Sequence, residues 1–246
     1  MSVGTVPGVE EATDTVAGVV IRVPPSHCGR PGFANGGWIA GLAAGLLTGP
    51  GTRPGTPVEV TPRAAVPLDA PVTGRRDGQR AFLLDGSGSV LTKATVGTDI
   101  LPAPGFVPLA VARRAGGAGN RVESPFPGCF GCGFDREGGL RVTLGRAGGD
   151  TFAGVWTPPA VSGELPARYV WAALHCPAGL VFLEGGGRAV LERVTLARYR
   201  APMSGEPNVV VALSAGANRG RRLSAAALYT STGELVAHSA GAWIVG

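Results

Sequence analysis

Two groups of residues in this chain have side chains and spacing that could act on a carbonyl group. The first is Asn35-Gly36-Gly37, which opens the uncharged, small-residue run of residues 33–47. Asn35 suits a helix N-cap, and the glycines leave the first backbone N–H groups of that helix uncovered. Such a helix end can polarise a carbonyl group or hold an anion. The same glycines would also let a buried structural helix pack closely, so both interpretations stay open.

The second group is His175-Cys176, which we expect at the start of another apolar helix. His175 could serve there as a general base or orient a ligand. The neighbouring imidazole and the helix end would favour a thiolate at Cys176, which makes a nucleophile conceivable. A buried cysteine before a proline such as Pro177 more often only fills space.

Cys129 and Cys132 have the spacing of a zinc or redox motif. Tetrahedral zinc needs four ligands, and the sequence has no second Cys-x-x-Cys and no spaced histidine pair. His27, Cys28 and Cys176 could join these two residues only through the fold. We therefore predict a structural loop, with no metal site and no cofactor.

Composition and charge limit the class of partner. The 246 residues carry a formal net charge of +5, and the arginines are scattered. This suits a phosphate-bearing small ligand or an acidic carrier protein better than a nucleic acid, which normally calls for a basic stripe with aromatic residues. The N-terminal residues lack the layout of a signal peptide, and no run reaches membrane-spanning length. We expect a cytoplasmic protein that binds neither nucleic acid nor membrane.

The strand-like segments of the chain occur twice in the same order. In the first half they occupy residues 16–23, 58–66, 72–75, 80–85 and 90–96. Residues 99–128, rich in Pro, Gly and Ala, resemble a surface linker. Matching segments follow about 135 to 145 residues later: residues 151–159 echo 16–25, 193–202 echo 59–67, 202–207 echo 67–71, and 228–236 repeat 83–91. An internal duplication follows from this order.

The duplication predicts an α+β protein with two units, residues 1–98 and 129–246, joined by a linker at 99–128. Each unit would be one apolar helix clasped by a curled antiparallel sheet. Two such units can pair edge to edge into one continuous sheet, which removes exposed edges.

This order of elements, with Asn-Gly-Gly opening the helix, resembles the hotdog fold and, more narrowly, the tandem "double hotdog" thioesterases. Cys129-Phe-Gly-Cys-Gly133 with Gly139-Leu140 is similar to a leader found in some phenylacetate-type thioesterases and actinobacterial relatives. The resemblance implies a thioesterase acting on acyl-CoA or an acyl carrier protein, with CoA or phosphopantetheine as part of the substrate.

The resemblance also implies roles for single residues. The thioester carbonyl would be bound at Asn35, Gly36 and Gly37, and a carboxylate about nine residues along the partner helix would act as nucleophile or base. Counting from Asn35 gives Ala44, which has no such chemistry, whereas counting from His175 gives Glu184. The acyl group and its surroundings would be lined by Trp38, Leu42, Trp171, Cys176, Leu180 and Phe182.

The sequence therefore predicts a thioesterase-like hydrolase with Glu184, His175 and Asn35 as its catalytic residues. One alternative is a hotdog dehydratase or isomerase in which His175 moves a proton next to the carbonyl. Another is a non-catalytic acyl-thioester-binding protein, because the first helix lacks a carboxylate. A homodimer is left open.

Overall fold

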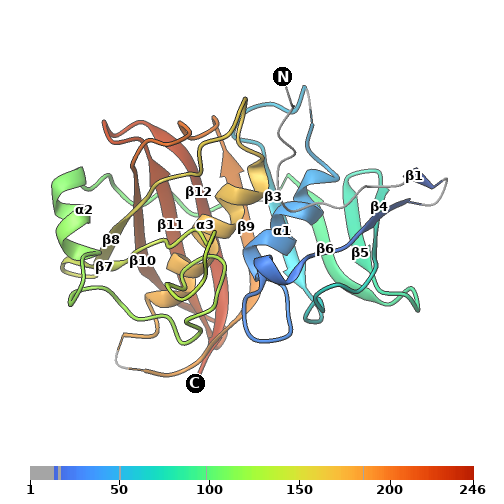
Figure 1. The fold of residues 1–246 in the computed structure, drawn as a ribbon, viewed down its shortest axis with the longest axis horizontal. Helices are drawn as coiled ribbons and strands as arrows, with labels where there is room; N and C mark the ends of the chain where they lie inside the picture. Colours follow the sequence, from blue (N-terminus) through green and yellow to red (C-terminus); the bar gives the residue numbers. More distant parts are fainter. Residues whose placement is uncertain (1–13, 16–17, 50, 98, 185) are drawn as a thin grey trace.

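Antiparallel strands build one continuous sheet in the computed structural model, which describes residues 14–15, 18–49, 51–97, 99–184 and 186–246 (Figure 1). The N-terminal strands are β1 (Asp14–Thr15), β2 (Gly18–Ile21), β3 (Pro57–Pro62), β4 (Val72–Asp77), β5 (Arg80–Leu84) and β6 (Val90–Val96). The C-terminal strands are β7 (Gly145–Gly148), β8 (Thr151–Trp156), β9 (Ala189–Arg198), β10 (Asn208–Asn218), β11 (Arg221–Tyr229) and β12 (Leu235–Val245).

The order of the strands keeps the two halves of the chain apart. It runs β1-β2-β4-β5-β6-β3-β9-β12-β11-β10-β8-β7, so the first six strands come from residues 14–96 and the last six from 145–245. The halves meet where β3 pairs with β9, with Val58 opposite Leu196 and Val60 opposite Val194. The prediction of an edge-to-edge continuous sheet is confirmed.

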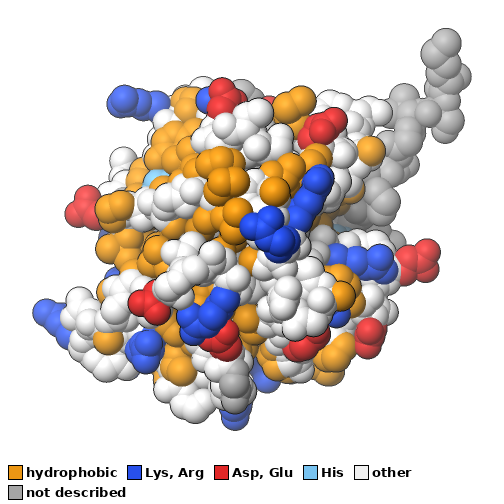
Figure 2. All heavy atoms as spheres, turned by 90° about the vertical axis from the view of Figure 1, so that its left-hand side faces the viewer, with side chains coloured by type: hydrophobic (Ala, Val, Ile, Leu, Met, Phe, Trp, Pro, Cys, Tyr) orange, Lys and Arg blue, Asp and Glu red, His pale blue; other side chains and the backbone are white. Residues whose placement is uncertain are grey.

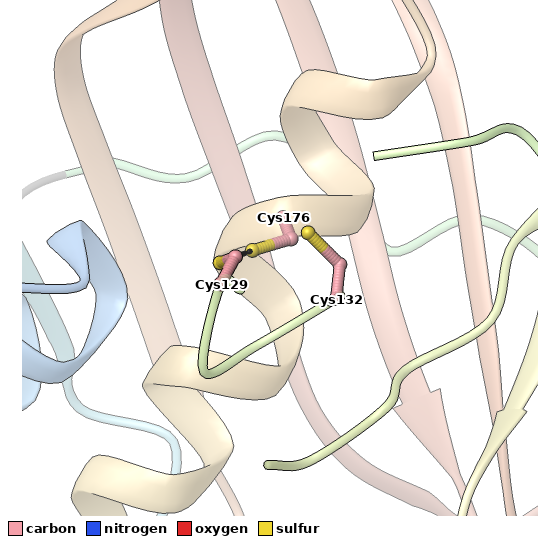
Figure 3. Close-up of side chains that lie close together, drawn as sticks. All are labelled: Cys129, Cys132 and Cys176. Carbon is pink, nitrogen blue, oxygen red and sulfur yellow. Dashed lines mark hydrogen bonds between the residues drawn. The ribbon is translucent and has the colours of Figure 1, made fainter. Parts of the chain in front are cut away.

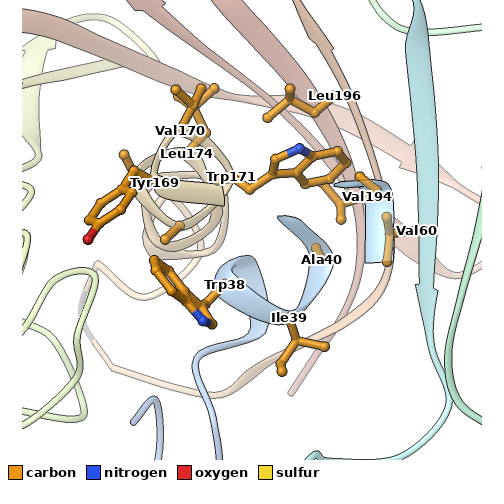
Figure 4. Packing of buried hydrophobic residues seen from close by; sticks show 14 of the residues in the cluster. Trp38, Ile39, Ala40, Val60, Tyr169, Val170, Trp171, Leu174, Val194 and Leu196 are labelled. Carbon is orange, nitrogen blue, oxygen red and sulfur yellow. The ribbon is translucent and has the colours of Figure 1, made fainter. Parts of the chain in front are cut away.

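Two helices, α1 (Gly36–Gly45) and α3 (Ala167–Leu180), pack against each other in the curve of this sheet (Figure 1). α1 forms where predicted, because Asn35 caps it and no charged residue interrupts its apolar surface. Around the helix pair the core is closed by residues of the two central strands (Figure 4). The labelled members are Trp38, Ile39 and Ala40 of α1, Tyr169, Val170, Trp171 and Leu174 of α3, Val60 of β3, and Val194 and Leu196 of β9.

α3 differs from the prediction in its register. It begins at Ala167 and runs through Pro177 to Leu180, so His175 lies within the helix and not at its start. The placement of His175-Cys176 at a helix N-terminus was wrong. Glu184 consequently lies beyond the last residue of α3.

The segment expected to be a linker also contains a helix, α2 (Leu109–Ala115), which packs on β8 and β10. On β10, Val209 and Val211 face the α2 side, whereas Val210 and Ala212 belong to the core around α1 and α3. Since successive residues of a strand point to opposite faces, β10 is covered on both of its faces. Residues 99–128 therefore do more than connect the halves.

The surface on the α2 side carries mixed charge. Basic and acidic side chains are scattered there among apolar ones and form no continuous basic stripe on this face (Figure 2). Within the described ranges, no helix combines the length and the apolar character needed to cross a membrane.

Candidate functional site

The N-terminus of α1 presents backbone donors without acceptors. Asn35, which is 1% exposed, caps the helix by accepting a hydrogen bond at Oδ1 from the Trp38 N–H at 3.0 Å. Its own N–H donates to the carbonyl of His27 at 2.8 Å. In the part of the chain that the structure describes, the N–H groups of Gly36 and Gly37 have no acceptor. This helix end can therefore donate two hydrogen bonds to a carbonyl oxygen or an anion.

His175 of α3 lies directly against this helix end. A Cβ atom added to Gly36 would stand 2.8 Å from Nε2 of His175, and one on Gly37 would stand 2.5 Å from the His175 Cβ. A Cβ on Gly41, one turn later, would stand 2.5 Å from the Cα of Arg168. The glycines of α1 thus permit close packing against α3, and they also leave the first N–H groups uncovered. The interpretation as a closely packed helix is confirmed, and the binding role of this helix end stays a prediction.

The surroundings of His175 favour a neutral imidazole. Burial lowers its pKa, although the nearby Cys129 acts in the opposite direction. Its Nδ1 atom is buried and has no hydrogen-bond partner among the described residues, and the ring of Trp243 lies 5.7 Å away, centre to centre. After the first turn of α3, His175 and Cys176 alone keep partial solvent exposure. A neutral histidine at a partly open position can accept a proton from a ligand that enters there.

Three cysteines lie beside the same helix end (Figure 3). The sulfur atoms of Cys129, Cys132 and Cys176 all lie within 4.8 Å of one another, and Cys129 Sγ is 3.8 Å from Cys176 Sγ. Hydrogen bonds to Cys129 and Cys132, together with burial, raise the pKa of Cys176 well above that of a free thiol. This argues against Cys176 as a nucleophile on its own.

Glu184 is not brought to the α1 helix end. It is exposed and paired with Arg146 of β7, whose Nε donates to Oε1 and Oε2 of Glu184 at 2.8 Å each. The structure therefore gives no support to the predicted catalytic role of Glu184. The reason is the register of α3, since counting from His175 assumed that the helix began there.

Counting from the observed helix starts gives a different result. Pro166 is the N-cap of α3, and the ninth residue after it is His175. Asn35 is the N-cap of α1, and the ninth residue after it is Ala44. Because Gly37 meets Ala172 and Gly41 meets Arg168, the two helices run antiparallel. His175 thus occupies, against the α1 N-terminus, the position at which the resemblance implied a carboxylate.

The residues predicted to line an acyl pocket are separated. Trp38 is fully buried in an aromatic cluster with His27, Phe130 and Tyr169, at ring distances of 4.0, 5.3 and 5.1 Å. Trp171 lines a cavity of about 260 Å³ at the other end of the helix pair, with Ala44 and Ala167. Leu42 is half-buried in the main core.

Two further predicted lining residues lie near the end of α3. Phe182 is half-buried, with its ring centre 6.4 Å from that of Trp243, and Leu180 is buried. The ring of Trp243 therefore lies near both Phe182 and His175. No single pocket is formed by the predicted set as a whole.

Sequence reasoning missed Cys129, Cys132 and Trp243 as neighbours of this helix end. Cys-x-x-Cys was a visible signal, but its third partner, Cys176, comes from another part of the chain. Trp243 gave no local signal, because it reaches His175 from β12 across the core.

Comparison with known proteins identifies the fold. No protein-family model matches the sequence, and no curated protein matches it. Among solved structures, a conserved protein with a hot dog fold from Alicyclobacillus acidocaldarius is 13% identical with a TM-score of 0.64, covering 96% of each chain. The acyl-CoA thioesterase II TesB2 of Mycobacterium marinum is 15% identical with a TM-score of 0.53, covering 92% of this chain and 91% of its own.

A third similar structure is the pyran synthase domain from module nine of the sorangicin pathway, which is 12% identical with a TM-score of 0.63 and covers 98% of each chain. At sequence identities this low, the comparison shows a shared fold and not a shared activity. With one antiparallel sheet curved around two central helices, and with these matches along nearly its whole length, the chain has the hotdog fold.

Proposed function

We propose that the protein is a thioesterase-like hydrolase that acts on an acyl-CoA or acyl-carrier-protein thioester. The observation that carries this proposal is the meeting of the unpartnered Gly36 and Gly37 N–H groups with the imidazole of His175. In this proposal the chain is a double hotdog, with units at residues 1–98 and 129–246, and this helix end holds its complete site.

The proposed reaction uses the helix end and the histidine in turn. The thioester oxygen accepts hydrogen bonds from the Gly36 and Gly37 N–H groups, which stabilise the charge that develops when water attacks the carbonyl carbon. One donor of this kind contributes roughly 3 kcal/mol to the transition state. His175 takes the proton of the attacking water and returns it to the departing thiolate, so that a carboxylic acid and a thiol are the products. Its neutral form suits this task.

The test measures hydrolysis of a panel of acyl-CoA and acyl-pantetheine thioesters. The reaction is monitored by the loss of thioester absorbance. His175→Gln should lower kcat by about 10²- to 10⁴-fold, the usual contribution of a positioned acid or base. Glu184→Gln is the matched control, because its exposed partner is Arg146 and it should leave kcat within about twofold. Full activity in His175→Gln, or loss of activity in Glu184→Gln, would refute the assignment.

A second candidate function is proton transfer next to the carbonyl, as in a dehydratase or isomerase. A histidine in place of a carboxylate at the helix end favours it, since an imidazole can both remove and return a proton. Incubation of saturated and β-hydroxy acyl-CoA substrates in deuterated water distinguishes this proton transfer from hydrolysis. Deuterium incorporation or loss of water without release of free CoA would establish this reaction and exclude hydrolysis.

The proposed substrate carries phosphate groups, which agrees with the net charge of +5. Parallel assays with the same acyl group on CoA and on a carrier protein show which thiol carrier is preferred. If every thioester of the panel binds and none reacts, the protein is an acyl-thioester-binding protein and both enzyme proposals fail.

A further inference from the structure

Three cysteine side chains from two distant parts of the sequence converge beside the α1 helix end (Figure 3). Cys129 and Cys132 come from the loop between α2 and β7, and Cys176 comes from α3. The spacing of Cys129 and Cys132 alone did not predict a metal site, because no third ligand was near them in the sequence. The fold supplies that third ligand.

The sulfur positions fit a single metal ion. Sulfur atoms bound tetrahedrally at about 2.3 Å from one zinc ion stand about 3.8 Å apart. Cys129 Sγ and Cys176 Sγ are 3.8 Å apart, and Cys132 Sγ lies within 4.8 Å of both. A shift of the Cys132 side chain by no more than about 1 Å would complete the triangle that zinc requires.

The loop that carries Cys129 and Cys132 is shaped to bring both sulfurs to Cys176. A Cβ on Gly131 would stand 2.7 Å from Cys176 Sγ, and one on Gly133 would stand 2.1 Å from the Pro127 carbonyl oxygen. Only glycine allows the loop to fold back so tightly against α3.

Asn35 gives an independent indication of a charged ligand. Its amide Nδ2 lies 3.4 Å from Cys129 Sγ and 3.9 Å from Cys176 Sγ, and Asn35 is 1% exposed. In the described structure these sulfurs are the only acceptors of that amide group. A neutral thiol accepts hydrogen bonds weakly, whereas a metal-bound thiolate is a charge-assisted acceptor. A buried amide directed at the sulfurs therefore fits thiolates better than three packed thiols.

We propose that Cys129, Cys132 and Cys176 bind one Zn²⁺ ion, with Asn35 donating a hydrogen bond to the ligand sulfurs. Thiolate ligands select zinc over magnesium or calcium. Three protein ligands leave the fourth position to water or to an exogenous ligand. The ion joins the Cys129–Cys132 loop to α3 beside Gly36. The site does not depend on the proposed hydrolase activity.

The test measures metal in the full-length chain. Purified without chelator, the protein should contain one equivalent of zinc by mass spectrometry, and cobalt in its place should give a thiolate-to-cobalt charge-transfer band and visible bands of a four-coordinate ion. Cys129→Ser and Cys176→Ser should lower the affinity for cobalt by more than about 100-fold, since loss of an outer partner alone costs about 10- to 100-fold. Cys28→Ser is the matched control, because Cys28 is also buried and free but lies outside the group. It should keep one equivalent.

A second measurement uses the unaltered chain, in case the serine variants do not fold. Zinc should protect Cys129, Cys132 and Cys176 from alkylation and leave the modification of Cys28 unchanged. Substoichiometric metal with no charge-transfer band in the unaltered protein would overturn the proposal. So would a disulfide between two of the three cysteines in the protein as purified, or equal loss of metal in Cys28→Ser.

Discussion

The contact between α1 and α3 predicts opposite effects for the same substitution at two glycines of one helix. In Gly37→Ala, the new Cβ would stand 2.5 Å from the His175 Cβ, 2.6 Å from the Trp171 carbonyl oxygen and 2.7 Å from the Ala172 Cα. Two of these atoms belong to the α3 backbone and cannot rotate away. In Gly45→Ala, at the exposed end of the same helix, nothing lies within 4 Å of the new Cβ.

The magnitudes follow from two opposing terms. Carbon atoms pack at about 3.5–4.0 Å, so Gly37→Ala forces α1 and α3 apart by about 1 Å. Overpacking of this kind costs about 1–3 kcal/mol, and the higher helix propensity of alanine returns about 1 kcal/mol. Because the α3 backbone atoms that the new Cβ meets cannot rotate away, we take the upper cost of about 3 kcal/mol. After subtraction of the gain in helix propensity, the free energy of unfolding should fall by about 2 kcal/mol. Gly45→Ala should raise it by about 0.5 kcal/mol.

The assay is thermal unfolding followed by circular dichroism, with urea unfolding to give the free energies. For a chain of this length Gly37→Ala should lower Tm by about 4–8 °C and Gly45→Ala should raise it by about 1–2 °C. Gly37→Ala should also lower thioester hydrolysis, because it moves His175 away from the Gly36 N–H group. An unchanged Tm in Gly37→Ala, or a shift of both variants in the same direction, would show that the helices are not in the close contact described.

Three further substitutions test single interactions. Burial, with the charges of Arg168 and Arg136, lowers the pKa of His27 to about 4 from 6.5, so the unfolded chain takes up the proton first as pH falls. The free energy of unfolding should therefore decline between pH 6.5 and 4, by at most about 3 kcal/mol. Urea titrations at several pH values should show a flatter decline for His27→Gln. An equally steep decline in the variant would contradict the lowered pKa of His27. Asn35→Ala removes the cap of α1 and should lower the free energy of unfolding by about 0.5–2 kcal/mol in urea unfolding, and no change would mean that the cap contributes nothing. Glu184→Gln breaks an exposed ion pair and should change stability by less than about 1 kcal/mol, so a larger loss would give that pair a structural role.

The N-terminal half of the fold was predictable because its signals are local. An uncharged run with an N-capping asparagine gave α1, and short alternating runs with Gly turns gave β4, β5 and β6 close to their observed bounds. The repeat then predicted the joined sheet, since hairpin β11–β12 repeats hairpin β5–β6. Each of these inferences needed only neighbouring residues or a second copy of the same pattern.

The register of α3 was not predictable in the same way. Proline suits the first turn of a helix and interrupts its interior, so Pro177 agrees with a helix that starts near His175. In the structure Pro177 lies inside α3, where packing on α1 and the sheet outweighs the lost hydrogen bond. Because of that error, counting nine residues from the expected helix start gave Glu184, whereas counting from the observed N-cap gives His175. The cysteine group was missed for a different reason, since only tertiary contact joins Cys176 to the Cys129–Cys132 loop.

The two ends of the helix pair differ in the side chains that could act on a ligand. At the α1 N-terminus stand Asn35, His175 and the three cysteines, whereas at the α3 N-terminus Pro166 takes the place of Asn35 and Ala44 takes the place of His175. The residues that line the cavity at that second end include Ala44, Trp171, Tyr199, three threonines and two arginines, and none of them is a histidine or a carboxylate. In a dimer of two identical units, both ends of the helix pair would carry the same residues. In a single chain with two different units, the reactive side chains can be present at one end and absent from the other.

This difference predicts one productive site per chain. Calorimetric titration with a non-hydrolysable thioester analogue should give one bound molecule per chain, and His175→Gln, which changes only the α1 end, should lower kcat by the full range of about 10²- to 10⁴-fold. A fall in turnover of only about half in His175→Gln, far short of that range, or two equivalent bound molecules, would mean that the end with Ala44 also works. The binding site would then have to be sought in groups that both ends share, which are the backbone donors of the two helices and not their side chains.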